Sequence, residues 1–181
     1  MLPFFRRKVV PAGPHEFGAE IEIGCPASEV YPLLDLADPR HAKRQLGDRV
    51  QAVIGEPGKF TMVVSELPAA VFTLAVTAEE CEREYAFSCV SSVSFSRVAR
   101  SHEHYVLEDM GKAGCRLILT QTIEFDRELS EDEYGMEAMM LTFAGFSALA
   151  KIKLHAEEGV EAVKAMSEAQ MAALDDFDCL D

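Results

Sequence analysis

Two histidines spaced by one residue form the most direct metal-binding pattern in this sequence. On a strand, His102 and His104 would point to the same side of a sheet, together with Glu108. Two imidazoles and a carboxylate are suitable ligands for zinc or iron. However, Tyr105 and Leu107 alternate with this set, which assigns the histidines to the solvent side. We therefore expect exposed histidines, with no bound metal and no cofactor.

The residues that could transfer protons lie on separate segments of the chain. No spacing indicates that they converge on one site, and the sequence has no Ser-His-Asp order, P-loop or dinucleotide-binding glycine pattern. The sequence thus favours a binding protein over an enzyme, and catalysis stays open as an alternative. The acid–base candidates are Arg83, Tyr85, His104, Tyr105 and Arg116.

The cysteines predict neither a disulfide framework nor a zinc ribbon, because their number is odd and no CxxC occurs. Reduced thiols in a cytoplasmic protein are the better interpretation. The cysteines are Cys25, Cys81, Cys89, Cys115 and Cys179.

Charge and length limit the possible partners. The 181 residues suit one domain, and 17 basic against 31 acidic residues give a net charge of −14. Such a charge repels phosphate backbones, so nucleic acid is not expected as a partner. The longest uncharged stretch, residues 138–150, has 13 residues, fewer than the roughly 20 that span a membrane. No segment has the pattern of a signal peptide.

The hydrophobic pattern predicts an α+β domain. Residues 17–23 alternate as a half-buried strand does, and a helix follows from about Ser28 to Asp38, with a second short helix at about 40–46. Period-two segments then predict six strands joined mostly by short connections, as in an antiparallel meander. These segments are 50–54, 60–64, 72–76, 85–89, 102–109 and 117–125.

A long helix closes this domain. Ser130 and Glu133 match a capping box, which predicts a helix over about residues 131–158. Its broad apolar stripe includes Met136, Met140 and Phe143 and is expected to face the concave side of the sheet. A loosely held basic arm (1–16) and a dispensable acidic tail or short helix (159–181) flank the domain, which spans residues 17–158.

This order of elements resembles the helix-grip fold of the START/Bet v 1-like superfamily (SRPBCC), the polyketide cyclase/dehydrase and lipid-transport group. The most telling residues are 21–34, Ile-Glu-Ile-Gly-Cys-Pro-Ala-Ser-Glu-Val-Tyr-Pro-Leu-Leu, which look like the superfamily's first strand, elbow and first helix. The resemblance covers about residues 17–158. It implies a seven-stranded curved antiparallel sheet wrapped around the long helix, with an apolar cavity between them.

The expected function is binding or carriage of a small hydrophobic or aromatic molecule in that cavity, by a monomer or a homodimer. A polyketide cyclase/aromatase-like enzyme and an Hsp90-activator-like interaction module are the alternatives that the resemblance implies. Gln121, Tyr85 and Tyr105 are the polar exceptions on the inward face of the sheet and would meet a ligand's polar group. The full set of expected ligand-binding residues is Met62, Phe72, Leu74, Tyr85, Phe87, Tyr105, Leu107, Leu119, Gln121, Met136, Met140 and Phe143.

Overall fold

The computed structural model describes residues 8–65, 67–93 and 97–178, and the side chains of residues up to 169 within these ranges. The strands are β1 (Val9–Val10), β2 (His15–Ile23), β3 (Arg49–Ala52), β4 (Lys59–Val63), β5 (Phe72–Glu80), β6 (Glu84–Ser91), β7 (Val98–Asp109), β8 (Cys115–Phe125) and β9 (Leu129–Ser130). The helices are α1 (Ala27–Leu34), α2 (Ala42–Gln45), the 3-10 turn η1 (Gly111–Ala113), α3 (Glu131–Glu158) and α4 (Val160–Asp178). Cys179 and residues 1–7 of the expected basic arm lie outside the described residues.

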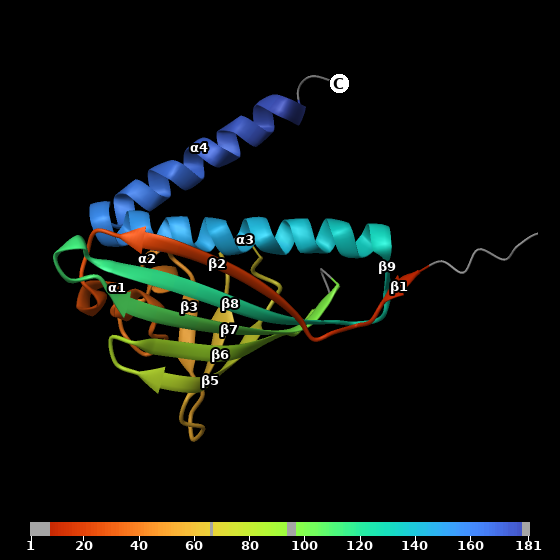
Figure 1. Cartoon of the computed structure of the whole chain (residues 1–181), viewed down its shortest axis with the longest axis horizontal. Coiled ribbons are helices and arrows are strands. Elements are labelled where there is room, and N and C mark those ends of the chain that lie inside the picture. The colour runs from red at the N-terminus through yellow and green to blue at the C-terminus, as the bar shows by residue number, and fades with distance from the viewer. Residues whose placement is uncertain (1–7, 66, 94–96, 179–181) are drawn as a thin grey trace, which may run out of the picture.

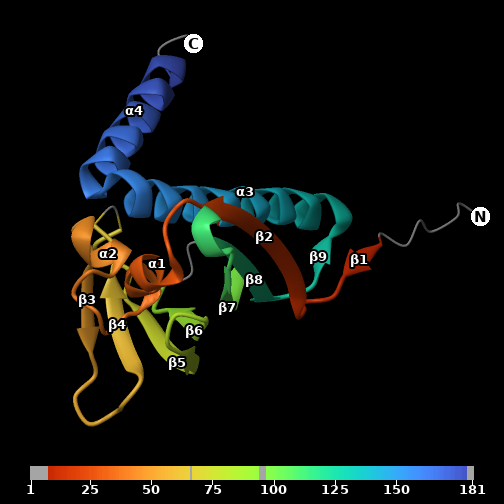
Figure 2. The same ribbon diagram turned by 60° about the vertical axis from the view of Figure 1, so that its left-hand side comes forward.

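Seven strands form one antiparallel sheet in the order β2-β8-β7-β6-β5-β4-β3. The sheet curves beneath α3, which lies over β2 and β8, while α1 and α2 are at the β3–β4 end (Figures 1 and 2). Neighbouring strands are consecutive in sequence from β3 to β8, as short connections predict, and β2 closes the order by pairing with β8. The predicted α+β helix-grip architecture is confirmed.

The elements differ from expectation mainly at their ends. α1 stops at Leu34, because Asp35 adopts an extended backbone with φ −71° and ψ 113°. Pro32 is accommodated inside α1, where it is buried. Part of the expected N-terminal arm is ordered into strands, since β1 pairs with β9 and β2 begins at His15.

The start of α3 confirms the capping box. The Ser130 side chain accepts a hydrogen bond from the backbone N–H of Glu133, and the Glu133 carboxylate accepts one from the backbone N–H of Ser130. The helix ends at Gly159, whose φ of 90° suits glycine.

The expected orientation of the Met/Phe stripe on α3 is wrong. Met136, Met140 and Phe143 are 61%, 53% and 72% exposed, so they do not face the sheet. The buried residues of α3 include Gly145 instead, and a Cβ added there would lie 3.0 Å from Oε1 of Gln121. Because α3 approaches the sheet this closely, large side chains do not fit beneath it at this point, and the stripe points away from the sheet.

The C-terminal segment forms a helix, which is one of the two forms expected for it. α4 begins directly after Gly159 and buries Val163 completely, and it then diverges from α3 (Figure 1). The first half of α4 therefore packs against the domain, and whether residues 159–181 are dispensable for the fold stays a prediction.

Candidate functional site

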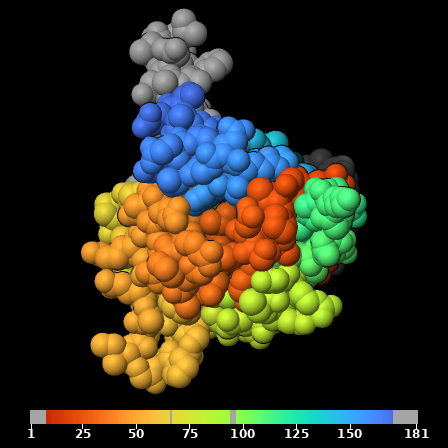
Figure 3. Space-filling view, turned by 90° about the vertical axis from the view of Figure 1, so that its left-hand side faces the viewer, coloured from red at the N-terminus to blue at the C-terminus, as the bar shows by residue number. Residues whose placement is uncertain are grey.

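A cavity of about 490 Å³ lies between the sheet, the α1–α2 segment and the C-terminal half of α3. Figure 3 views the end of the molecule where α1 and α2 lie directly below the end of α3 and the start of α4. The volume falls in the range of small-molecule binding sites, roughly 300–1,000 Å³. Residues from α4 also line the cavity, so α4 covers part of it.

The lining combines an apolar wall with several polar groups. Its apolar members are Leu33, Leu34, Leu36, Ala42, Leu46, Met62, Leu74, Phe87, Cys89, Ala148 and Ile152. Its polar members are His41, Lys43, Asp48, Ser65, Glu103, Tyr105, Lys151, His155, Lys164, Ser167 and Glu168.

Glu103 and Tyr105 form a hydrogen-bonded pair on the sheet wall of the cavity. They are two residues apart on β7, so both point inward, and the Tyr105 hydroxyl donates to Oε2 of Glu103 over 2.6 Å. Phe87 stacks on Tyr105 with ring centroids 6.3 Å apart and supports the pair from β6.

Burial governs the ionisation of this pair. It raises the pKa of Glu103, although the Tyr105 hydrogen bond and the Lys43 charge act in the opposite direction. Burial and the nearby Glu103 charge raise the pKa of Tyr105 well above its ordinary value. The carboxyl is thus the titratable group of the pair, and Tyr105 stays protonated as a hydrogen-bond donor.

Two buried histidines line the cavity opposite the sheet. His41 precedes α2 and is 6% exposed, while His155 lies on α3 and is 7% exposed. Burial, together with the charges of Arg44 and Lys43, lowers the pKa of His41 to about 4, and burial also lowers the pKa of His155. Both imidazoles are therefore neutral near pH 7.

The hydrogen bonds of His155 define its tautomer. Its Nε2 lies 2.9 Å from Oε1 of Gln45, an acceptor, so Nε2 carries the proton. Nδ1 of His155 and Nδ1 of His41 are buried without a hydrogen-bond partner among the described residues. Nδ1 of His155 is thus an acceptor that no described side chain satisfies.

Arg44 anchors α2 in this position. Its guanidinium donates to the backbone carbonyl of Leu36 over 2.7 Å and to that of Val50 over 2.5 Å, which ties α2 to the segment after α1 and to β3. Asp48 follows α2 and accepts hydrogen bonds from the backbone and side chain of Ser65. Hydrogen bonds within the domain therefore fix the positions of the Arg44 and Asp48 side chains.

Four of the expected site residues line the cavity, namely Met62, Leu74, Phe87 and Tyr105. Tyr85, Leu107 and Leu119 face inward as expected but are buried in the core, and Phe72 and Gln121 are half-buried outside the cavity lining. The Tyr85 hydroxyl is used within the fold, since it accepts a hydrogen bond from the backbone N–H of Leu36 over 3.0 Å. Met136, Met140 and Phe143 lie on the far side of α3, where they contribute nothing to the cavity.

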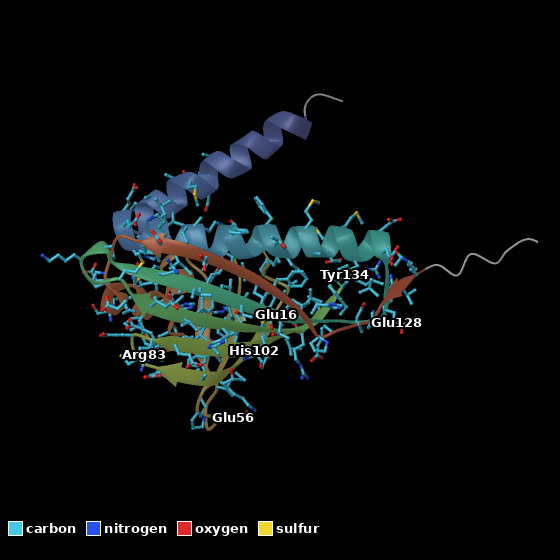
Figure 4. All side chains as sticks on the ribbon, viewed as in Figure 1. Glu16, Glu56, Arg83, His102, Glu128 and Tyr134 are labelled. Carbon is cyan, nitrogen blue, oxygen red and sulfur yellow. The ribbon has the colours of Figure 1, made fainter. Side chains whose placement is uncertain are left out.

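The other candidates for chemistry lie outside the cavity. His102 and His104 contact Thr77 and Glu84, each at 2.9 Å, and Figure 4 shows His102 and Arg83 away from α3. Arg83 pairs with Glu80, and Arg116 pairs with Glu22 and Glu108. Within the described part of the chain, no group of three or more His, Cys, Asp or Glu side chains is placed to hold a metal ion.

Glu103, His41 and His155 are among the cavity residues that the sequence analysis did not predict. The alternation that placed Tyr105 inward places Glu103 inward as well, so this signal was present in the sequence. His41 precedes α2 and His155 lies in the last turn of α3, and their approach to the cavity depends on tertiary packing that no local sequence pattern marks. Cys89, another lining residue, carries a thiol whose pKa is raised to about 11 by burial, which makes it a poor nucleophile.

Solved structures share this fold at low sequence identity. Ara h 8.0201 superposes with a TM-score of 0.59 and 15% identity over 80% of this chain and 98% of that one. DynU16, a putative protein in the dynemicin biosynthetic locus, also has a TM-score of 0.59 and 15% identity. The match covers 80% of this chain but only 48% of DynU16. Norcoclaurine synthase from Thalictrum flavum, solved with dopamine and hydroxybenzaldehyde, has a TM-score of 0.55 and 12% identity over 88% of each chain.

No protein-family model and no curated protein sequence matches this chain. The structural similarities, together with the sheet and helices described above, show that it has the Bet v 1-like, or SRPBCC, helix-grip fold. No helix in the described ranges is long and apolar enough to cross a membrane.

Proposed function

We propose that this protein binds a small hydrophobic or aromatic molecule in the cavity beneath the C-terminal half of α3. The observation that carries the proposal is the cavity of about 490 Å³, with its apolar wall and inward-facing Glu103–Tyr105 pair. Apolar lining with a few convergent polar groups is the common form of a small-molecule site. Norcoclaurine synthase, which shares this fold, was solved in complex with dopamine and hydroxybenzaldehyde, and these aromatic ligands support the choice of an aromatic ligand for this cavity.

The polar groups favour a ligand with a hydrogen-bonding end. Oε2 of Glu103 accepts the Tyr105 hydrogen bond, and Oε1, which has no hydrogen bond to any described residue, suits an N–H or O–H donor of a ligand. The apolar body would then lie against Leu74, Phe87 and Ile152. A phenol or an aromatic amine fits this division better than a plain hydrocarbon.

Native mass spectrometry of the freshly purified protein tests this proposal first, because a retained ligand adds its own mass. A thermal-shift panel of phenols, aromatic amines, flavonoids and fatty acids follows. A ligand at 100 times its dissociation constant stabilises the folded state by about 2.7 kcal/mol, which raises Tm by roughly 5–11 °C. Absence of both an added mass and any shift would refute binding.

Two variants connect a positive result with this cavity. Met62→Trp places a bulky ring in the cavity and should abolish the shift for every ligand, whereas Glu103→Gln should weaken amines and phenols more than fatty acids. Gln121→Leu is the matched control, since Gln121 lies on the same sheet face but outside the cavity lining. Equal effects of Gln121→Leu and Glu103→Gln would assign binding to another place.

Proton-transfer catalysis in the same cavity is a second candidate function, favoured by the raised pKa of Glu103. A carboxyl of this kind can exchange a proton with a bound substrate through one oxygen, while the Tyr105 hydroxyl donates a hydrogen bond to the other oxygen of Glu103. If the retained ligand is converted on incubation, Glu103→Gln should abolish turnover while keeping measurable binding. Unchanged turnover in that variant would exclude Glu103 as the acid–base group.

A further inference from the structure

The lining of the cavity is less acidic than the protein as a whole. The chain has 17 basic and 31 acidic residues, whereas three lysines balance three acidic side chains in the lining. Basic groups are therefore concentrated at this cavity relative to the rest of the chain. The lysines are Lys43, Lys151 and Lys164, and the acids are Asp48, Glu103 and Glu168.

Two of these lysines already have an acidic partner. Nζ of Lys43 lies 3.9 Å from Oδ2 of Asp48. Nζ of Lys164 lies 2.7 Å from Oε1 of Glu161. The ammonium group of Lys151, by contrast, makes no ion pair or hydrogen bond with any described residue. Lys151 is thus the lining cation whose charge the described part of the chain leaves uncompensated.

The position of Lys151 directs its stem toward the cavity. It is half-buried and lies on the same face of α3 as Ala148, Ile152 and His155, which recur at helical spacing and also line the cavity. A half-buried ammonium group loses part of its hydration, and a negative group nearby offsets that loss. A bound anion would supply the missing partner.

The charge available favours a single negative charge on that anion. One ammonium group without a partner matches a carboxylate. A phosphate dianion would also need Lys43 or Lys164, whose charges Asp48 and Glu161 already offset. The chain carries a net charge of −14, so its other surfaces repel an anion and this cavity is the favourable place for one.

We propose that the cavity ligand is an aromatic carboxylic acid with a phenol or amino group at its other end, and that Lys151 binds its carboxylate. This inference rests on the proposed function and adds the charge and orientation of the ligand. The phenol or amine would donate to Oε1 of Glu103 on the sheet wall, while the carboxylate accepts from Nζ of Lys151 on the helix wall. The reverse orientation would place the ligand's carboxylate against Glu103, where two acidic groups repel each other.

Isothermal titration calorimetry of the full chain with matched acids and amides tests this inference. The probes are para-hydroxycinnamic, para-hydroxyphenylacetic and para-aminobenzoic acid, each compared with its own primary amide, which has the same shape and no charge. We expect at least one acid to bind about tenfold or more tightly than its amide, because hydrogen bonds between charged groups are strong. High salt should reduce this ratio, since a partly exposed charge pair is screened.

Lys151→Gln separates the carboxylate subsite from the rest of the cavity. It should bring the acid-to-amide affinity ratio close to unity by weakening the acid and leaving the amide unchanged, whereas Lys151→Arg should retain a preference for the acid. Lys112→Gln is the matched control, because it removes the same charge from an exposed residue of η1 outside the cavity lining. Its ratio should equal that of the unmodified protein.

Circular dichroism establishes that each variant is folded, and the ratio measured on the unmodified protein tests the inference without any variant. If phenols or amines bind but no acid binds more tightly than its own amide, the carboxylate subsite is overturned and cavity binding stands. A preference for the acid that Lys151→Gln leaves unchanged overturns the subsite as well. If no acid, amide, phenol or amine binds, the proposed function fails and this inference fails with it.

Discussion

Acidification should destabilise this protein through His41. The folded state holds the pKa of His41 at about 4 against an ordinary 6.5, because the ring is buried beside Arg44 and Lys43. Below pH 6.5 the unfolded chain therefore binds more protons than the folded one, and stability falls as pH falls. From these two pKa values the loss is about 2 kcal/mol between pH 7 and 5, and about 3 kcal/mol by pH 4.

His41→Phe removes this titration and keeps a planar ring in the site. Urea unfolding followed by circular dichroism at pH 7 and 5 measures the free energy of unfolding of both proteins. The unmodified protein should lose about 2 kcal/mol more than His41→Phe over this interval. The contribution of Glu103, whose raised pKa acts in the opposite direction, is common to both proteins and cancels. Equal losses in the two proteins would show that His41 is not held neutral by burial.

Three other predictions concern the framework of the site. Tyr85→Phe should cost about 1–3 kcal/mol in urea unfolding, because the buried N–H of Leu36 loses its acceptor. Gly135→Ala should stabilise the exposed start of α3 by about 0.5–1 kcal/mol, whereas Gly145→Ala should not, since its Cβ would press on Gln121; equal effects would contradict the close approach of α3 to the sheet. Truncation after Glu158 should lower Tm by at least about 3 °C through loss of Val163 burial, and an unchanged Tm would restore the view of a dispensable tail.

The strand order could be predicted because alternation and short connections leave few alternatives. Each inward position on β6 and β7 follows from its neighbour two residues away, so the inward orientation of Phe87 and Tyr105, which both line the cavity, follows from the sequence. The same rule does not say which inward residues meet empty space. Leu107 and Leu119 also point inward but are covered by neighbouring side chains, which depends on the position of α1 and α3 over the sheet.

The rotation of α3 could not be predicted from its hydrophobic pattern. The more apolar face of an isolated amphipathic helix is expected to be buried, and the Met/Phe stripe is that face by residue type. In the structure α3 instead packs against the sheet with the face that carries Gly145, Leu149 and Ile152. Close packing depends on the shape and size of side chains as well as on their hydrophobicity, and the small Gly145 lets the helix approach the sheet. A helix that is apolar on both faces can bury only one of them against the sheet.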